Sequence, residues 1–126
     1  MCMTKSIMFI DDDQDDVEIF SDALRNLDSG VEITVAENGL KALDLLNNKL
    51  PGLIVLDLNM PFLDGKQTFE KIKANPKLGD VPIIIFTSSV NPADRMMFDT
   101  LGISFITKPD TVAGIDTVVG VMLDHC

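Results

Sequence analysis

The stretch LIVLDLNMPFLDG, residues 53–65, is the most informative part of the sequence because a continuous apolar run in it is followed directly by an acid. The four apolar residues Leu53–Leu56 are typical of a strand that is covered on both faces of a parallel sheet. Asp57 follows at once, and a charged side chain is seldom buried without a partner or a metal. The stretch therefore predicts a buried strand that ends at a functional carboxylate.

The same pairing of an apolar run with a helical pattern occurs along the whole chain. Strands are predicted at residues 7–10, 33–36, 53–56, 83–86 and 104–106. After each strand, apolar residues recur at three- and four-residue steps, the spacing of a helix with one buried face. The residues expected to be buried are Val17, Phe20, Leu24 and Leu27 in the first helix, Leu40, Leu43 and Leu46 in the second, Phe69 and Ile72 in the third, and Ile115, Val118, Val119 and Met122 in the fifth.

Turn and capping residues punctuate this pattern. Asn91 is expected to cap the fourth helix, with Pro92 at its first position and Gly102 after its end. Asp110 is expected to cap the fifth helix. Strands that alternate with helices imply right-handed crossovers and a parallel sheet with helices on both faces. The predicted fold is therefore α/β and flavodoxin-like: a doubly wound five-stranded parallel sheet of order 2-1-3-4-5, flanked by five helices.

Length and charge limit the possible functions. The 126 residues, 46% of them apolar, suffice for one core, so we expect a single domain over 1–126 with no effector domain. No apolar stretch approaches the roughly 18 residues that span a bilayer, and no signal peptide precedes the first acids, which predicts a cytoplasmic protein. A formal net charge of −10 argues against nucleic acid or an anionic membrane as direct partner. Cys2 and Cys126 lack a metal or redox spacing and are expected to be free thiols.

Acidic side chains follow two of the predicted strands. Asp11 and Asp12 come directly after the first strand and Asp57 after the third. In a doubly wound sheet of this order, ligands bind outside the carboxyl ends of the strands, between strands one and three. Carboxylates that meet there raise one another's pKa unless a cation neutralises them. Because oxygen ligands suit Mg²⁺, these acids predict a site for Mg²⁺ or another divalent cation.

A simpler interpretation of the acids after the first strand remains open. Carboxylates near the start of a helix are stabilised by its positive end. Asp15 and Asp16 are expected to do only that, and Asp11 and Asp12 alone would fit the same role.

Two other strand ends carry groups that suit a phosphoryl group. Thr87 ends the fourth strand in the run Thr87-Ser88-Ser89, and Lys108 follows the fifth. A hydroxyl donor and an ammonium supply the electrostatic stabilisation that phosphoryl transfer chiefly requires. Taken singly, Thr87 is an ordinary strand-end residue and Lys108 an ordinary solvated cation. Pro109 would fix the backbone beside Lys108, in either peptide isomer.

As an ordered set, these motifs resemble the receiver domains of two-component response regulators, particularly the stand-alone chemotaxis type. The resemblance covers nearly the whole chain. Its elements are Asp11-Asp12, Asp57 within Leu56-Asp57-Leu58-Asn59-Met60-Pro61 ahead of Asp64-Gly65, Thr87, and Lys108-Pro109.

The resemblance implies a role for each of these residues. Asp57 would be the phosphoacceptor and the modified residue. Asp12 would bind Mg²⁺ directly, Asp11 through water or a neighbouring acid, and Asn59 through its backbone carbonyl. Thr87 and Lys108 would contact the phosphoryl oxygens, as parts of the catalytic set.

The resemblance also implies an output. Displacement of Thr87 and Lys108 would carry the signal to the surface of the fourth helix, fifth strand and fifth helix, with Phe105 at the aromatic switch position. Many relatives carry tyrosine there, and this sequence contains none, so the ring cannot donate a hydroxyl hydrogen bond. Phe105 could equally be ordinary core. Met96 and Met97 could form an adaptable contact surface together with Met122, although at least one of the three is expected to fill the core.

The function so implied is a phosphoacceptor switch that is not a turnover enzyme. Its partners would be a sensor histidine kinase or a histidine phosphotransfer protein and an unidentified downstream protein, with the chain itself a monomer or a weak homodimer. Passing the phosphoryl group onward in a phosphorelay is an alternative.

Three rival functions use related features. A haloacid-dehalogenase-like phosphotransferase would need a second acid where Asn59 stands, and a cap for which the chain has no room. A flavodoxin-like cofactor binder would have to place its phosphate beside the acids that follow the first strand. A degenerate receiver that serves only for docking would not need the intact acid, threonine and lysine set.

Overall fold

Strands and helices alternate from Ser6 to His125 in the computed structural model, which describes residues 5–60, 64–88 and 91–125. Cys2, Pro61, Ser89 and Cys126 lie outside the described residues. The strands are β1 Ser6–Ile10, β2 Glu32–Ala36, β3 Leu53–Leu56, β4 Ile83–Thr87 and β5 Ser104–Thr107. The helices are α1 Gln14–Leu27, α2 Gly39–Leu46, α3 Gly65–Ala74, α4 Pro92–Thr100 and α5 Val112–His125, with a short 3-10 helix at Pro76–Leu78.

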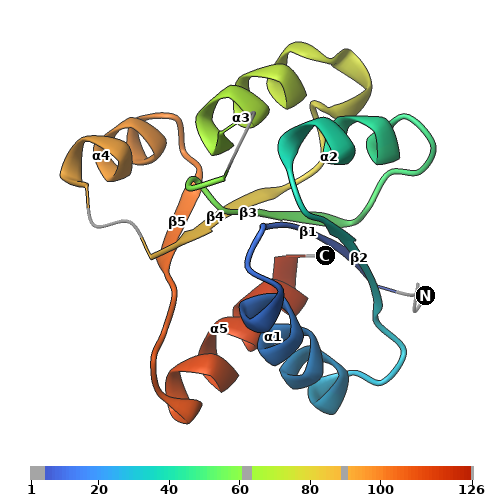
Figure 1. Cartoon of the computed structure of the whole chain (residues 1–126), viewed down its shortest axis with the longest axis vertical. Helices are drawn as coiled ribbons and strands as arrows, with labels where there is room; N and C mark the ends of the chain where they lie inside the picture. The colour runs from blue at the N-terminus through green and yellow to red at the C-terminus, as the bar shows by residue number, and fades with distance from the viewer. Residues whose placement is uncertain (1–4, 61–63, 89–90, 126) are drawn as a thin grey trace.

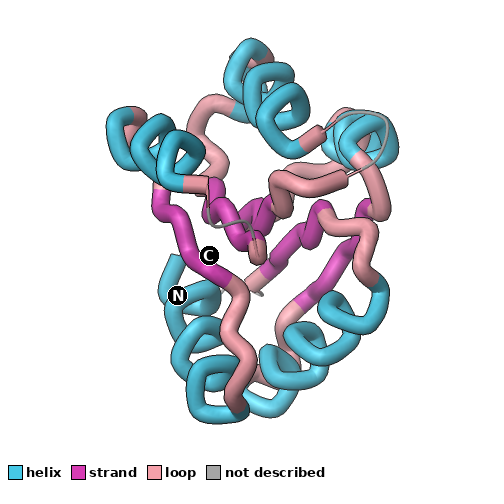
Figure 2. The backbone as a smooth tube through the Cα atoms, turned by 60° about the vertical axis from the view of Figure 1, so that its left-hand side comes forward, coloured by secondary structure: helices cyan, strands magenta, loops and turns pink. Residues whose placement is uncertain are grey.

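All five strands are parallel and form one sheet in the order β2-β1-β3-β4-β5, as predicted. Figure 1 shows α1 and α5 on one face of the sheet and α2, α3 and α4 on the other. The view in Figure 2 shows the same strands between two layers of helices. The doubly wound α/β fold is therefore confirmed.

Side chains on successive strand residues fill two separate cores. Met8 and Ile10 of β1 belong to the core under α2, α3 and α4, whereas Ile7 and Phe9 belong to the core under α1 and α5. The central strands β1, β3 and β4 are almost wholly buried, which explains their continuous apolar sequences. Strand β2 departs from this rule because it lies at the edge of the sheet, and Val35 there is exposed.

Two of the leucines predicted to be buried are exposed. Leu27 is 56% exposed because it is the last residue of α1. Leu40 is 60% exposed because the buried face of α2 runs through Gly39, Ala42 and Leu46, so that only Leu46 of the predicted leucines is fully buried. Spacing identified each helix correctly but shifted the buried face of α2.

The helix ends are mostly as predicted. Asn91 caps α4 by accepting a hydrogen bond from the amide of Ala93 at 3.0 Å, and Gly102 after this helix has a φ of 72°. The prediction that Asp110 caps α5 is wrong. Thr111, one residue later, does so because its Oγ1 accepts a hydrogen bond from the amide of Gly114 at 3.0 Å. No described helix has both the length and the apolar character needed to cross a bilayer.

Candidate functional site

The sheet register brings Asp11, Asp57 and Lys108 to one edge. Each of these residues stands directly after a strand, and its amide continues the hydrogen bonding of the sheet. The Asp57 amide donates to the Ile10 carbonyl at 3.0 Å, and the Lys108 amide donates to the Thr87 carbonyl at 2.9 Å. Because side chains alternate along a strand, all three side chains leave the sheet on the face covered by α1 and α5.

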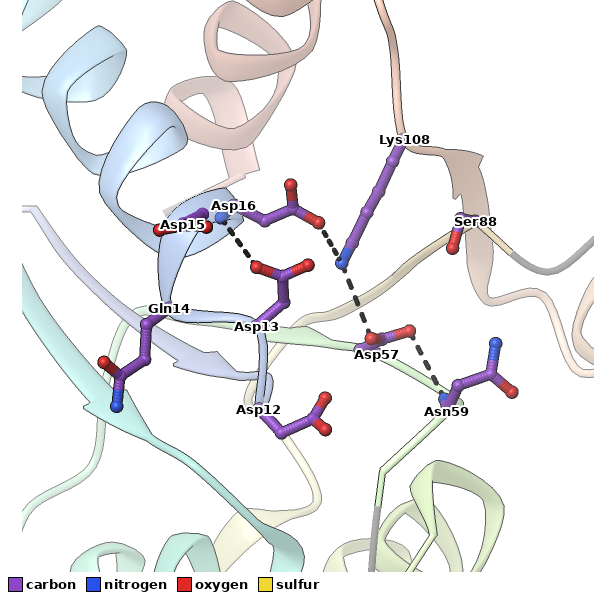
Figure 3. Close-up of a pocket in the computed structure, with 9 residues that line it drawn as sticks. All are labelled: Asp12, Asp13, Gln14, Asp15, Asp16, Asp57, Asn59, Ser88 and Lys108. Atoms are coloured by element: carbon purple, nitrogen blue, oxygen red, sulfur yellow. Dashed lines mark hydrogen bonds and ion pairs between the residues drawn. The ribbon is translucent and has the colours of Figure 1, made fainter.

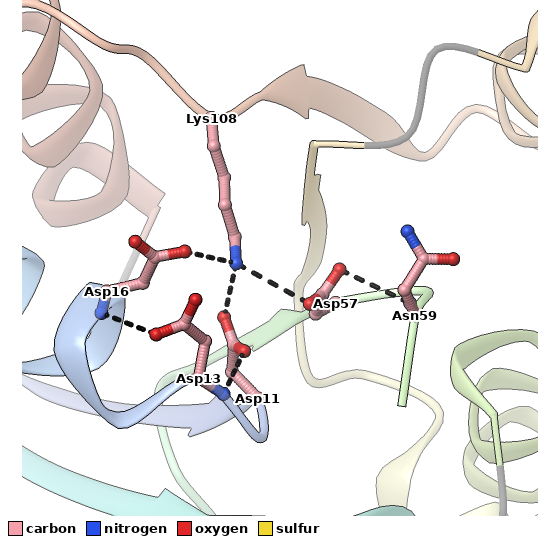
Figure 4. Close-up of polar contacts among 6 residues, drawn as sticks. All are labelled: Asp11, Asp13, Asp16, Asp57, Asn59 and Lys108. Carbon is pink, nitrogen blue, oxygen red and sulfur yellow. Dashed lines mark hydrogen bonds and ion pairs between the residues drawn. The ribbon is translucent and has the colours of Figure 1, made fainter. Parts of the chain in front are cut away.

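Lys108 is the centre of a cluster of ion pairs. Its Nζ lies 2.8 Å from Asp11 Oδ2, 2.9 Å from Asp16 Oδ2 and 3.5 Å from Asp57 Oδ2. The Lys108 side chain is only 9% exposed, and Figure 4 shows it reaching down between the carboxylates. One ammonium therefore faces three carboxylates in a largely buried place.

Asp11, Asp12 and Asp57 form a group that could hold a metal ion. One carboxylate oxygen from each lies within 4.8 Å of the others, with Asp11 and Asp57 buried and Asp12 exposed. Two of them, Asp12 and Asp57, line an open pocket of about 600 Å³. Figure 3 shows its lining residues, which are Asp12, Asp13, Gln14, Asp15, Asp16, Asp57, Asn59, Ser88 and Lys108.

Backbone amides hold the acids of this loop in place. Asp11 Oδ1 accepts a hydrogen bond from the amide of Asp13 at 2.9 Å. Asp13 in turn caps α1 by accepting from the amide of Asp16 at 3.1 Å. Across the pocket, the amide of Asn59 donates to Asp57 Oδ1 at 3.3 Å. The carboxylates are thus oriented before any ligand arrives.

Burial and crowding set the charge balance of the site. Burial raises the pKa of the Asp11 carboxyl to about 6, against the lowering effect of Lys108. Burial also acts to lower the pKa of Lys108, but the hydrogen bonds that Lys108 donates to Asp11 and Asp16, together with its attraction to the charges of Asp11 and Asp57, outweigh burial and hold that pKa above its usual value. A single lysine therefore does not neutralise these acids. Hard oxygen donors with excess negative charge fit the requirements of a divalent cation such as Mg²⁺.

Residues 7–119 match the family model of the response regulator receiver domain. This chain belongs to that family. Receiver domains are phosphoacceptor switches of two-component systems, not turnover enzymes.

Individual relatives agree with this family. The response regulator Rcp1 of Synechocystis sp. is 32% identical over 112 residues, which cover 82% of this receiver domain and 76% of Rcp1. The sensor histidine kinase CheAY of Helicobacter pylori is 34% identical over 116 residues, which cover 90% of this chain but only 14% of CheAY.

Solved structures show the same fold. The phosphorylated cyanobacterial phytochrome response regulator RcpA has a TM-score of 0.86 at 27% identity, covering 95% of this chain and 91% of its own. The Mn²⁺-bound form of Rcp1 has a TM-score of 0.83 at 28% identity, covering 94% and 91%. The acidic pocket of this receiver domain is therefore of a kind that binds a divalent metal in its family.

Thr87 and Phe105 lie behind the pocket of this receiver domain and do not line it. Thr87 is fully buried at the end of β4, and the next residue, Ser88, faces the pocket. The ring of Phe105 is buried with its centroid 6.1 Å from that of Phe98, and the Arg95 guanidinium lies 5.7 Å from it. Because Phe105 pairs with Ile85, it shares a sheet face with Thr87.

The methionines of the two C-terminal helices divide between the core and the surface. Met122 fills the core under α1 and α5, whereas Met96 is 70% exposed on α4 beside the half-exposed Met97. The Lys108–Pro109 peptide is trans.

Sequence reasoning missed the role of Asp16. It was expected only to stabilise the start of α1, yet it pairs directly with Lys108. The signal was its position in the first turn of α1, which places it next to the strand ends, but the reach of Lys108 across the pocket is not visible in sequence.

Proposed function

We propose that this receiver domain accepts a phosphoryl group on Asp57 in a reaction that requires a divalent cation. The observation that carries the proposal is the position of the Asp57 carboxylate. It is buried, oriented by the Asn59 amide, flanked by Asp11 and Asp12, and 3.5 Å from the Lys108 ammonium. Phosphoryl transfer depends mainly on such positioning and on compensation of charge.

The transfer step follows from ordinary phosphoryl chemistry. A carboxylate oxygen of Asp57 attacks phosphorus as the bond from phosphorus to the donor nitrogen or oxygen breaks, and the leaving group keeps that electron pair. The Lys108 ammonium offsets the negative charge on the transferred oxygens. When bound among Asp11, Asp12 and Asp57, with the Asn59 carbonyl beside them, Mg²⁺ supplies further positive charge for the same purpose.

A phosphohistidine is the donor that we propose, presented by a sensor histidine kinase or a histidine phosphotransfer protein. Two relatives support this donor class: CheAY is a sensor histidine kinase, and the RcpA structure is of a phosphorylated response regulator. Attack of water on the acyl phosphate would regenerate the Asp57 carboxylate and release inorganic phosphate. The domain would thus catalyse only the addition of a phosphoryl group to its own Asp57 and the removal of that group.

The proposed output uses the residues behind the pocket. A phosphoryl group on Asp57 would draw Lys108 and the Thr87 hydroxyl inward. Thr87 shares a sheet face with Phe105, whose ring packs against Phe98 of α4. A shift of Thr87 would therefore alter how α4 packs, and would bias an existing equilibrium at the α4, β5 and α5 surface that a downstream protein reads.

Metal dependence tests the proposal. We expect a small acyl phosphate donor to add one phosphoryl group to the chain when Mg²⁺ is present, as measured by intact mass. Chelation of divalent cations should slow this labelling roughly a hundredfold or more, because several kcal/mol of charge stabilisation are removed. Restoring excess Mg²⁺ should restore the rate. Equal labelling with Mg²⁺ and with chelator would contradict the proposal.

A further inference from the structure

The carboxylate of Asp16 lies nearer to Lys108 than the carboxylate of Asp57 does. The distance from Lys108 Nζ to Asp16 Oδ2 is 2.9 Å, whereas the distance to Asp57 Oδ2 is 3.5 Å. Figure 4 shows the Asp16 carboxylate directed at the ammonium from the first turn of α1. The unphosphorylated protein thus gives Asp16 a better ion pair with Lys108 than it gives the proposed phosphoacceptor.

The ammonium of Lys108 has no donor to spare. It carries three N–H groups, and it contacts one oxygen each of Asp11, Asp16 and Asp57. Because the contact with Asp57 is the longest of the three, moving the ammonium toward a phosphoryl group on Asp57 would lengthen its contact with Asp11 or with Asp16. Asp11 is buried, whereas the Asp16 side chain is 33% exposed, so water can hydrate the Asp16 carboxylate when its ion pair with Lys108 breaks. Breaking the ion pair of Lys108 with Asp16 therefore costs less free energy than breaking its ion pair with Asp11.

We propose that Asp16 is a positioning residue for Lys108. Its carboxylate holds the ammonium beside the pocket and competes with Asp57 for it. The strength of this competition then helps to set how fast Asp57 is phosphorylated. The inference rests on the proposed phosphorylation of Asp57.

Asp15 provides the comparison that separates this role from general acidity. It precedes Asp16 in the first turn of α1 and lines the same pocket. Both acids share the favourable position near the positive end of the helix. Among the described ion pairs, however, only those of Asp11, Asp16 and Asp57 involve Lys108. The two neighbours carry equal charge but differ in contact with the lysine.

Labelling rates test the proposal in the full chain. Asp16→Asn and Asp15→Asn each remove one negative charge from the pocket, so a charged donor gains equally from both. Only Asp16→Asn frees Lys108 to meet the phosphoryl oxygens. We expect Asp16→Asn to be labelled by a small acyl phosphate, with saturating Mg²⁺, roughly three- to tenfold faster than Asp15→Asn, the range expected for losing a partly exposed ion pair. Asp16→Glu keeps the charge and should return the rate toward that of the wild type.

A second measurement checks that Asp16 acts through Lys108. In urea denaturation of the unphosphorylated protein, Asp16→Asn and Lys108→Gln should be non-additive, with a coupling of roughly two- to fivefold in the unfolding equilibrium constant. Asp15→Asn and Lys108→Gln should be additive.

The outcomes separate this inference from the proposed function. Equal labelling of Asp16→Asn and Asp15→Asn would overturn the positioning role, and so would additivity of Asp16→Asn with Lys108→Gln. A wild-type chain that takes no phosphoryl group would overturn the proposed function itself, and this inference with it.

Discussion

Asp57→Asn is expected to abolish phosphoryl labelling while leaving the fold intact. The amide has no anionic oxygen with which to attack phosphorus, and no other described acid combines burial with a hydrogen bond from Asn59 and a contact to Lys108. The substitution also removes one of three crowded carboxylates, and Lys108 keeps Asp11 and Asp16 as partners. The free energy of unfolding should therefore change by no more than about 1 kcal/mol.

Intact mass after incubation with a small acyl phosphate and Mg²⁺ measures this loss. Asp80→Asn is the matched control, because it removes the same charge from an exposed position that does not line the pocket. The control should be labelled like the wild type. Labelling of Asp57→Asn at the wild-type rate would remove Asp57 from its proposed role.

Gly65→Ala is expected to destabilise the fold strongly. A Cβ on Gly65 would collide with the carbonyl oxygen of Asp57 and with Cα of Leu58. The Gly65 amide also donates to the Leu58 carbonyl at 3.1 Å, so α3 begins against the backbone that carries Asp57. Because backbone must move on one side or the other, we expect a loss of roughly 3 kcal/mol in the free energy of unfolding. Asp57 would be displaced as well, so the labelling rate should fall.

Urea denaturation measures this effect, and Gly120, a glycine with open space around it, provides the comparison. Gly120 lies inside α5, and a Cβ there would meet nothing within 4 Å. Gly120→Ala should therefore stabilise the protein by about 0.5–1 kcal/mol, since alanine is the better helix former. If Gly65→Ala proved as stable as Gly120→Ala, the close approach of α3 to the Asp57 backbone would be refuted.

The sequence predicted the sheet more accurately than the helix faces. The strand at Leu53–Leu56 was placed to the residue because strands buried on both sides read as unbroken apolar runs. The prediction of which helix face is buried depends on apolar spacing alone, and spacing does not fix how a helix is rotated about its axis against the sheet. Leu40 was therefore assigned to the core, although Gly39 and Ala42 lie on the buried face of α2 and Leu40 is exposed. Similarly, capping side chains at Asp110 and Thr111 look alike in sequence, and only the structure separates them.

The candidate site was predictable where strand ends alone position it. Asp11, Asp57 and Lys108 each follow a strand directly, so parallel topology was enough to bring them together. The pairing of Asp16 with Lys108 depends on how α1 leaves the sheet and on the reach of a long side chain. The position of Thr87 behind the pocket depends on which face of the sheet the last side chain of β4 points to. Neither can be inferred from motif spacing.

We propose that Asp11, Asp12 and Asp57 together hold a divalent cation beside the phosphoacceptor. Anomalous diffraction from crystals soaked in Mn²⁺ tests it most directly, because the signal locates the ion without reference to activity. We predict one strong anomalous peak in the pocket, from a Mn²⁺ ion that carboxylate oxygens of Asp12 and Asp57 coordinate, with the Lys108 ammonium beside the ion. A pocket without a peak at saturating Mn²⁺, or an ion bound only elsewhere on the surface, would contradict the account.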